Sequence, residues 1–326
     1  MNQTKPELSI IILGCNQAAK ILRLLTSIQA QSFLPDATEI IYTDDLSTDY
    51  TLTQLQSFSS KLPLQNAENN TGKRNRAAAR NRGAAIANAE WFLFLDGDGE
   101  LDKDFVAQLW QHRERDTVLT TAVLPHPEAV CPARRYEVLR SPAYRAQTTG
   151  NTTIHGYHLQ SIAFLIHRTS FQQANGFDEA FAGRSGEDID LGIRLAVFGT
   201  KLRVVPTALY YHNHPRTIRE LVDVKEKYAA QGIPRILKHD TTIFRAARLN
   251  WLFEENPPYR TKHPLLFKCL KLFSLPIWSK IAERGQFWWT GRTLIPLLCF
   301  IGTMNGFHRY ITTGKITEED AGWSLG

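Results

Sequence analysis

The 326-residue sequence predicts an α/β protein, with a mostly parallel central sheet flanked by helices and a mainly helical C-terminal region. Two observations predict this fold class. Short apolar runs of strand length alternate, from residue 8 to about 205, with segments whose apolar residues recur at helical spacing. The composition, 43% hydrophobic and 21% charged, is that of a globular chain long enough to bury a large core, and it excludes a disordered one.

Simple patterns define the first two strand–helix units. The apolar run over residues 8–13 ends at Gly14, as a buried strand ends at a turn. Residues 18–31 follow as a helix, because apolar side chains recur there at helical spacing: Ile21, Leu24, Leu25 and Ile28. A second strand is expected at residues 39–43, and residues 47–49 offer capping side chains for a helix that runs to about Phe58.

The alternation continues through a third strand at residues 62–67 and an Ala- and Arg-rich helix at 74–89. Residues 91–95 are five consecutive apolar residues bounded by turn formers, which predicts a fully buried strand. The remaining predicted elements are a helix at 103–113, strands at 117–123, 161–167 and 202–205, and helices at 170–175, 188–198 and 218–232. Residues 125–151 contain prolines and little periodicity, so we expect a loop over the site there.

The most informative stretch is the buried strand that runs directly into Asp96 and Asp98. Open α/β sheets bind their ligands at the carboxyl ends of the strands. Two carboxylates one residue apart offer the oxygen ligands that Mg²⁺ and Mn²⁺ prefer. The sequence therefore predicts a divalent-cation site at this edge of the sheet, and such a cation would hold a diphosphate.

A series of motifs carries a family resemblance. In chain order they are Ser9–Ile12, Ile40–Asp49, Ala78–Gly83, Phe94–Asp98, Asn175–Asp178 and Gly186–Leu191. This ordered series, over about residues 8–215, resembles family 2 glycosyltransferases of the GT-A fold. The resemblance implies an enzyme that transfers a sugar, with inversion, from a nucleotide diphosphate sugar (a UDP-sugar is favoured) to an acceptor hydroxyl. It also implies a Mn²⁺ or Mg²⁺ cofactor.

The resemblance assigns four residues to the donor. Asp45 matches the acid that binds the uracil and its ribose, and Arg80 matches a residue near the nucleotide phosphates. Asp98 matches a direct metal ligand, and Asp96 reaches the ribose or, through water, the metal. Two alternatives stay open from the residues themselves: Asp45 as a helix-capping or turn acid, and Arg80 on a solvated helix face.

The resemblance also assigns the chemistry. Asp188 matches the catalytic base and Glu187 the acid that orients the acceptor, with plain N-capping of a helix as the alternative. His212 and His214 match a region where relatives use a histidine to bind the metal or diphosphate. Residues one apart in an extended segment face the same way. Histidines that are simply satisfied structural residues are the alternative.

We place a domain boundary near residue 216, with a catalytic domain at 1–216 and a helical, basic and aromatic region at 217–326. Its most apolar parts are Phe287–Trp289 and Leu294–Ile301, and no apolar run reaches the length of about 20 residues that a spanning helix needs. The composition fits an interfacial helix on an anionic membrane, which would make a lipid-linked acceptor plausible. The alternatives are a subdomain that packs on the catalytic domain and a dimer surface.

The net charge of +6 suits anionic partners, yet no nucleic-acid-binding module is recognisable. Four well-separated cysteines and a polar N-terminus without the layout of a signal peptide predict a cytoplasmic protein, with peripheral contact on the inner face of the membrane left open. The role expected is cell-surface glycan or glycolipid synthesis. The competing function is a catalytically silent nucleotide-sugar-binding or scaffold protein on the same fold.

Overall fold

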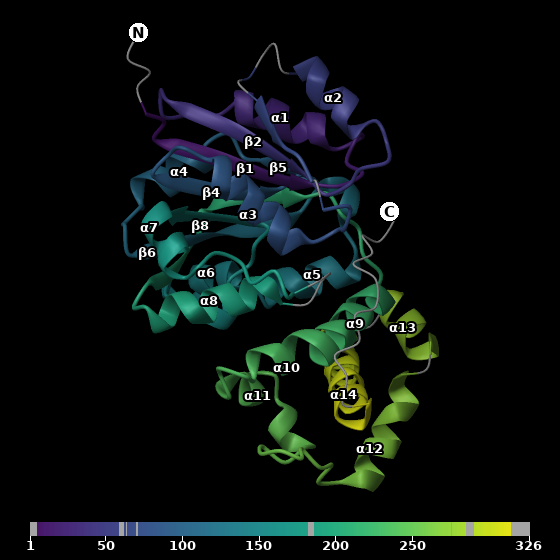
Figure 1. Ribbon diagram of the computed structural model, residues 1–326. Coiled ribbons are helices and arrows are strands. Elements are labelled where there is room, and N and C mark those ends of the chain that lie inside the picture. Colours follow the sequence, from purple (N-terminus) through teal and green to yellow (C-terminus); the bar gives the residue numbers. More distant parts are fainter. Residues whose placement is uncertain are drawn as a thin grey trace.

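The computed structural model describes residues 5–58, 62, 64–69, 71–181, 186–274, 276–284 and 290–313. A sheet flanked by helices forms one part of the molecule, and a group of helices lies beneath it (Figure 1). The strands are β1 (Leu8–Gly14), β2 (Thr38–Asp44), β3 (Leu64–Ala67), β4 (Trp91–Asp96), β5 (Gly99–Leu101), β6 (Thr117–Pro125), β7 (Ala163–His167) and β8 (Lys201–His212). The helices around the sheet are α1 (Ile21–Gln29), α2 (Thr51–Phe58), α3 (Arg76–Ile86), α4 (Phe105–Gln111), α5 (Pro132–Leu139), α6 (Pro142–Thr149), α7 (Arg168–Gln173) and α8 (Glu187–Val197).

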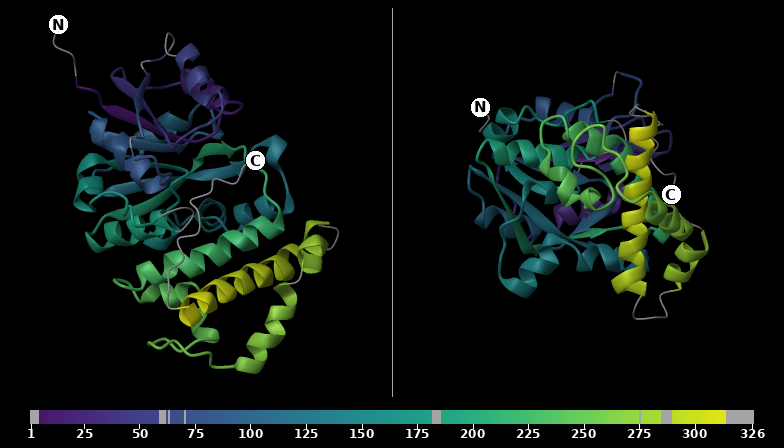
Figure 2. Two further views of the ribbon diagram at one scale, coloured as in Figure 1. Left: turned by 45° about the vertical axis from the view of Figure 1, so that its right-hand side comes forward. Right: turned by 90° about the horizontal axis from the view of Figure 1, so that it is seen from below.

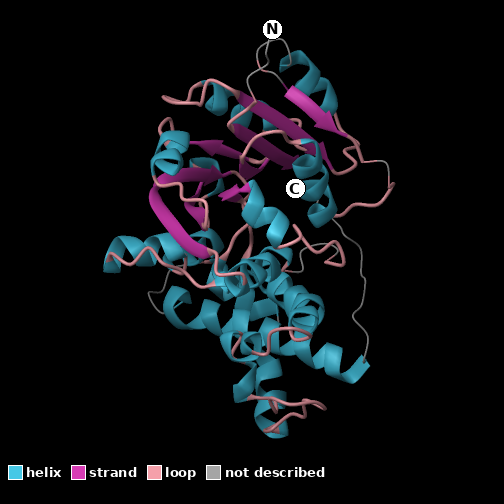
Figure 3. Cartoon of the chain, turned by 60° about the vertical axis from the view of Figure 1, so that its left-hand side comes forward, coloured by secondary structure: helices cyan, strands magenta, loops and turns pink. Residues whose placement is uncertain are grey.

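The described strands form one sheet in the order β3-β2-β1-β4-β7-β6-β8-β5. Strands β1, β2, β3 and β4 pair in parallel, as do β6 and β8. Strand β7 runs antiparallel to both of its neighbours, and β5 runs antiparallel to β8. The predicted α/β fold is confirmed, with a sheet that is parallel at the β1 side and mixed beyond β4. Figure 3 shows the strands gathered at one end of the molecule and helices alone at the other.

Central strands are buried on both faces, which explains their continuous apolar sequences. Every residue of β1 is buried: Ile10 and Ile12 pack in the core with α1, α2 and α4, whereas Ile11 packs in the core with α3, α7 and α8. Successive side chains of a strand alternate between the two faces of the sheet. A strand covered by helices on both faces has no exposed face, so its sequence shows no alternation of apolar and polar residues. The sheet is thus held as a rigid platform whose strand ends position the site.

Residues 125–151 do not form the predicted loop. They fold as the short turn Pro127–Ala129 and the helices α5 and α6. Proline at the first position of a helix costs no hydrogen bond, because that N–H has no partner in the helix, so the prolines that indicated a loop here begin helices instead. The Ser141 side chain accepts from the N–H of Tyr144, and Gly150 ends α6 with a φ of 74°.

Strand β8 is longer than the predicted strand at 202–205. Its pairing with β6 shifts register between Thr121 and Ala122, which face Val205 and Leu209, so the segment around Pro206 bulges from the ladder. Proline has no N–H to donate and is accommodated at such a bulge. The strand then resumes and carries its final residue, His212, to the same sheet edge as Asp96.

The C-terminal helices pack against the part of the molecule that contains the sheet. They are α9 (Ile218–Lys227), a π-helical turn at Tyr228–Gly232, α10 (Ile233–Ile236), α11 (Thr242–Ala246), α12 (Pro264–Lys271), α13 (Pro276–Glu283) and α14 (Ile295–Thr313). Helix α14 lies along α9 in both views of Figure 2. One apolar cluster joins Phe181 and Ile193 to residues of α14, and another joins Ala133 of α5 to α9 and α14.

This packing agrees with the subdomain interpretation of the C-terminal region, and the boundary at residue 216 stays a prediction. The segment Phe287–Trp289, which motivated the membrane interpretation, lies outside the described residues. Within the ranges described here, no helix combines the length and the apolar character that crossing a bilayer requires.

Candidate active site

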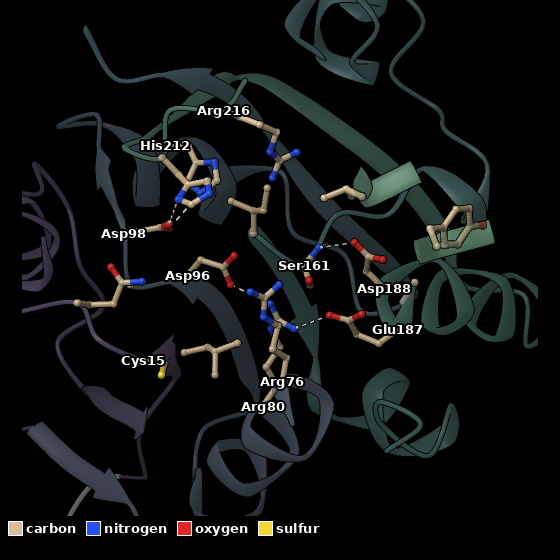
Figure 4. A pocket seen from close by; sticks show the side chains of 18 of the residues that line it. Cys15, Arg76, Arg80, Asp96, Asp98, Ser161, Glu187, Asp188, His212 and Arg216 are labelled. Carbon is tan, nitrogen blue, oxygen red and sulfur yellow. Dashed lines mark hydrogen bonds and ion pairs between the residues drawn. The ribbon is translucent and has the colours of Figure 1, made fainter. Parts of the chain in front are cut away.

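A cavity of about 610 Å³ opens between the carboxyl ends of the strands, the start of α8 and the side of α9 (Figure 4). Its walls contain seven of the eight site residues expected from the sequence: Arg80, Asp96, Asp98, Glu187, Asp188, His212 and His214. These residues come from α3, from the ends of β4 and β8, and from the first turn of α8. Residues more than 100 positions apart in the chain therefore converge on one cavity.

Strand pairing brings Asp98 and His212 together. Gly99 pairs with His212 across β5 and β8, and the N–H of Asn213 donates to the carbonyl oxygen of Asp98 at 2.8 Å. Glycine is required at position 99, because a Cβ there would lie 2.1 Å from the ring of Tyr210. The buried Tyr210 ring is thus the physical reason that a larger residue does not fit directly after Asp98.

The Asp98 carboxylate meets two imidazoles. Oδ1 lies 3.0 Å from Nε2 of His212, and Oδ2 lies 4.0 Å from Nδ1 of His214. Burial would raise the pKa of Asp98, but the two histidines outweigh it and hold that pKa well below its usual range. Among the described residues, Oδ1 of Asp98 makes no hydrogen bond beyond this ion pair, and Nδ1 of His212 is buried without a hydrogen-bond partner.

Carboxylate oxygens and imidazole nitrogens are ligand atoms that Mn²⁺ accepts. A buried imidazole nitrogen that lacks a hydrogen-bond partner in the protein fits a site whose partner is a bound cation. Asp98, His212 and His214 are accordingly the residues that could hold a divalent cation, with Asp96 beside them. In the described part of the chain, no three His, Cys, Asp or Glu side chains are already arranged as a metal site. The cation therefore stays a prediction.

Arg80 ties the two acidic motifs together. Its Nη2 donates to Oδ1 of Asp96 at 2.8 Å, and its Nη1 donates to Oε1 of Glu187 at 3.2 Å (Figure 4). The side chain is buried at 3% exposure, so the solvated helix face that was left open for Arg80 is wrong. Burial would lower the pKa of this guanidinium, but Asp96 and Glu187 raise it. Arg80 thus donates its hydrogen bonds to acidic side chains of the protein itself.

Asp188 begins α8 beside Glu187, after Gly186 with a φ of 96°. An oxygen of Asp188 accepts weakly from the N–H of Ser161 at 3.4 Å, and the other accepts from Ile189 at 2.9 Å. Burial first, and then the charge of Glu187, raise the pKa of Asp188 to about 6. A carboxylate with a pKa close to neutrality is suited to take and release a proton.

Asp45 does not join this group. The residue is fully buried at the end of β2, and it does not line the cavity. Its Oδ1 accepts from the backbone N–H of Asn75, the N-cap of α3, at 3.0 Å and from the side chain of Asn69 at 3.3 Å. These contacts agree with the turn-acid alternative, and contact with a base stays a prediction.

Several cavity residues were not expected from the sequence. Helix α9 and the π-helical turn contribute Val224, Lys225 and Tyr228. Within the described ranges the buried Tyr228 hydroxyl has no hydrogen-bond partner, and the Tyr228 ring lies 2.6 Å from the position of a Cβ on Gly186. No motif marks these positions, because α9 reads simply as an amphipathic helix. Further cations on the wall are Lys20, Arg76 and Arg216.

Comparison with known proteins agrees with this geometry. The family model "Glycosyl transferase family 2" matches residues 9–173, about half of the chain. The chain is 31% identical over 167 residues to the pre-mycofactocin glycosyltransferase of Mycobacterium tuberculosis (strain CDC 1551 / Oshkosh), which covers 50% of this chain and 35% of that protein. It is 29% identical over 227 residues to the validoxylamine A glucosyltransferase of Streptomyces hygroscopicus subsp. limoneus, with 61% of this chain and 50% of the relative covered. It thus matches half or less of the length of these relatives.

Solved structures share the fold. The mannosyltransferase PcManGT from Pyrobaculum calidifontis, in complex with GDP-Man and Mn²⁺, superposes with a TM-score of 0.65 at 17% identity and covers 94% of this chain and 89% of its own. TarS residues 1–349 from S. aureus, in complex with UDP-GlcNAc, gives a TM-score of 0.52 at 16% identity, covering 94% and 92%. From the family match, the ordered motifs and this fold, the chain belongs to glycosyl transferase family 2.

Proposed function

We propose that the protein is an inverting, divalent-metal-dependent glycosyltransferase that uses a nucleotide diphosphate sugar, with a UDP-sugar favoured, and an acceptor hydroxyl. One observation carries the proposal: Asp98 with two histidines, and Asp188 with a raised pKa, line the same 610 Å³ cavity. The first group suits a metal–diphosphate and the second suits a base, which are the two requirements of the reaction.

The donor diphosphate fits the end of the cavity at Asp98. A divalent cation held there by Asp98, His212 and His214 would neutralise the charge that develops on the leaving diphosphate. Lys20, Arg76 and Arg216 line the same cavity, and cationic side chains at a phosphate site add charge-assisted hydrogen bonds. Asp96 lies at the end of β4, with one oxygen on Arg80, and would reach the ribose or the cation through water.

Asp188 acts as the base in this proposal. It accepts the proton of the acceptor hydroxyl as the acceptor oxygen forms its bond to the anomeric carbon, and the bond from that carbon to the diphosphate oxygen breaks on the opposite face. Inversion follows from this single displacement. Glu187 is held by Arg80, so its charge serves to raise the pKa of Asp188, and contact with the acceptor is the additional role that the resemblance implies.

The solved relatives support the donor class, since PcManGT is described with GDP-Man and Mn²⁺ and TarS with UDP-GlcNAc. The cellular role we propose is the synthesis of a cell-surface glycan or glycolipid in the cytoplasm. Peripheral contact of the basic C-terminal region with an anionic membrane, and an acceptor that is lipid-linked, belong to the same proposal.

The test is turnover of a panel of nucleotide sugars with Mn²⁺, with and without simple acceptors, by the wild-type chain and by Asp188→Asn. We expect hydrolysis or transfer with one donor class, and a loss of about 10²–10⁴-fold in turnover for Asp188→Asn with donor affinity retained. The anomeric configuration of the product, read by NMR, should be inverted. Nucleotide-sugar binding without turnover by the wild type would instead support the silent binding protein, and a fully active Asp188→Asn would place the base elsewhere.

A further inference from the structure

A second cavity, of about 810 Å³, lies beside the first. Ile162, His212 and Lys225 line both cavities, so the two share a wall. The other walls of this second cavity, here called the basic cavity, come from the end of β6, from α5 and α6, from Ala246 at the end of α11 and from Arg248 after it. The basic cavity therefore adjoins the cavity that Asp188 lines.

The charge of the basic cavity is one-sided. Its lining contains five basic side chains and a single acid, Glu137, and the basic residues are Arg134, Arg140, Arg145, Lys225 and Arg248. Glu137 is already occupied, because its two oxygens lie 2.8 Å from Arg134 and 2.8 Å from Arg216. The lining is thus strongly cationic even after its one carboxylate is counted.

Three of these cations have no compensating acid. Arg140, Arg145 and Arg248 are exposed, and none of them lies within 4.0 Å of a carboxylate oxygen in the part of the chain that the structure describes. Exposed arginines elsewhere on this protein have acidic neighbours, as Arg115 and Arg245 do. A group of unpaired guanidinium ions around one concavity is the arrangement that recruits an anionic ligand.

The positive charge of these arginines shifts the pKa values of neighbouring side chains on different elements. Burial raises the pKa of Tyr136 on α5 to about 12, and Arg140 and Arg248 both oppose that rise. Burial first, and then Arg145, lower the pKa of His158 to about 4. The cations of α5, of α6 and of the turn after α11 therefore act on side chains within one cavity.

Resting on the proposed function, we propose that the basic cavity binds the acceptor and that this acceptor carries a phosphate-type anionic group. Guanidinium forks match the oxygens of a phosphate ester with paired hydrogen bonds, and the exposed ring of Tyr144 on the same lining offers a face on which a sugar or polyol ring packs. With the anion held between α5, α6 and Arg248, the acceptor hydroxyl extends past Ile162 to Asp188. The guanidinium groups would bind the phosphate oxygens in the same way whether these belong to a soluble phosphate ester or to a lipid headgroup.

The experiment measures probe binding with the donor site filled by Mn²⁺ and the nucleoside diphosphate that stabilises the protein best. The probes are glucose and glucose 6-phosphate, titrated by NMR, and vesicles of phosphatidylcholine with or without phosphatidylglycerol. The test variant is Arg140→Gln/Arg145→Gln, which changes two exposed side chains. The matched control is Arg135→Gln, an exposed arginine of the neighbouring helix α5 that does not line the basic cavity.

We expect at least about tenfold tighter binding of the phosphorylated probe than of its neutral partner, equivalent to about 1.4 kcal/mol. The double variant should lose this preference, and Arg135→Gln should keep it. Preference for glucose 6-phosphate identifies a soluble phosphate ester, and binding confined to phosphatidylglycerol vesicles identifies an anionic headgroup.

Two results would overturn the proposal. One is equal binding of neutral and anionic probes of both kinds, or a preference that survives in the double variant. The other is a loss of nucleoside diphosphate affinity in the double variant, which would assign these arginines to the donor. Nucleotide-sugar hydrolysis is followed in parallel and needs no acceptor, so an inactive wild type would count against the proposed function while probe binding is still read independently.

Discussion

Arg80 shows how a single residue determines the organisation of this site. A guanidinium with five N–H donors can serve two carboxylates at once, and Arg80 serves one acid from each of the motifs at the ends of β4 and α8. Neither Asp96 nor Glu187 would be tolerated in this partly desolvated place without a counter-charge. Arg80 therefore fixes the acid at the end of β4 relative to the acid at the start of α8.

Replacing Arg80 by methionine should lower the free energy of unfolding by about 3–5 kcal/mol, because it leaves two acids without their partner in a buried site. Chemical denaturation followed by fluorescence measures this loss. Arg82→Met on the same helix is the control: Arg82 donates to the carbonyl oxygen of Asp44, so only about 1 kcal/mol should be lost. Equal losses in the two variants would show that the Asp96–Arg80–Glu187 bridge contributes no more to the free energy of unfolding than the single hydrogen bond of Arg82.

The pH dependence of turnover should report Asp188. Its raised pKa of about 6 means that the carboxyl group is protonated below this pH and cannot accept a proton, so kcat should fall about tenfold per unit as pH drops below 6. Because the charge of Glu187 contributes to the raised pKa of Asp188, Glu187→Gln should shift this acidic limb of the pH profile, the fall in kcat below pH 6, to lower pH. Asp190→Asn, two residues along the same helix turn and paired with Arg194, should leave it in place. A limb that is the same in all three proteins would exclude Asp188 as the group that titrates.

At the scale of elements, the contact between α9 and α14 determines one wall of the cavity. Two glycines on α14 allow the helices to approach closely: a Cβ on Gly302 would lie 2.7 Å from the carbonyl oxygen of Val222, and one on Gly306 would lie 2.0 Å from that of Glu226. Helix α9 then presents Lys225 and, at the adjoining π-helical turn, Tyr228 to the cavity. Single π-helical turns often occur at functional sites.

Gly306→Ala should therefore separate α14 from α9 and lower the free energy of unfolding by about 1–3 kcal/mol, despite the better helix propensity of alanine. Denaturant titration measures the change, and turnover should fall with it because Tyr228 moves. Thr312→Ala is the matched control on the same helix, since Thr312 is exposed and bonds its own helix backbone, and it should change stability by less than about 0.5 kcal/mol. A stabilising Gly306→Ala would contradict the close contact.

The sequence predicted the elements that have a strong local pattern. The buried strand before Asp96 follows from its unbroken apolar run, the helix at 18–31 from its helical spacing, and the helix at 74–89 from its Ala- and Arg-rich composition. Helices α5 and α6 were missed because each has a proline at its first position, and proline is ambiguous between a loop and a helix start. The full extent of β8 was missed because its bulge at Pro206 is stabilised by pairing with β6, a contact distant in sequence.

For the whole molecule, the sequence predicted which acids matter but not how they are held. Asp96, Asp98, Glu187 and Asp188 were expected from the family resemblance, and the fold brings all four to one cavity. The bridge through Arg80 and the cavity wall from α9 could not be predicted. Each depends on tertiary contacts between segments distant in the chain, and no sequence pattern indicates that those segments meet. Asp45, equally prominent in the sequence, lies under the loop before α3 instead.

The central claim is that the cavity binds a nucleoside diphosphate through a divalent cation held at Asp98. The most direct test is the Mn²⁺-dependent rise in melting temperature caused by a nucleoside diphosphate, measured on the wild type and on Asp98→Ala. A concentration of about 100 Kd should stabilise the wild type by about 2.7 kcal/mol, a rise of several degrees. Asp98→Ala should show no Mn²⁺-dependent rise at all. An equal rise in both proteins would contradict the account, because the cation and its nucleotide would then bind elsewhere.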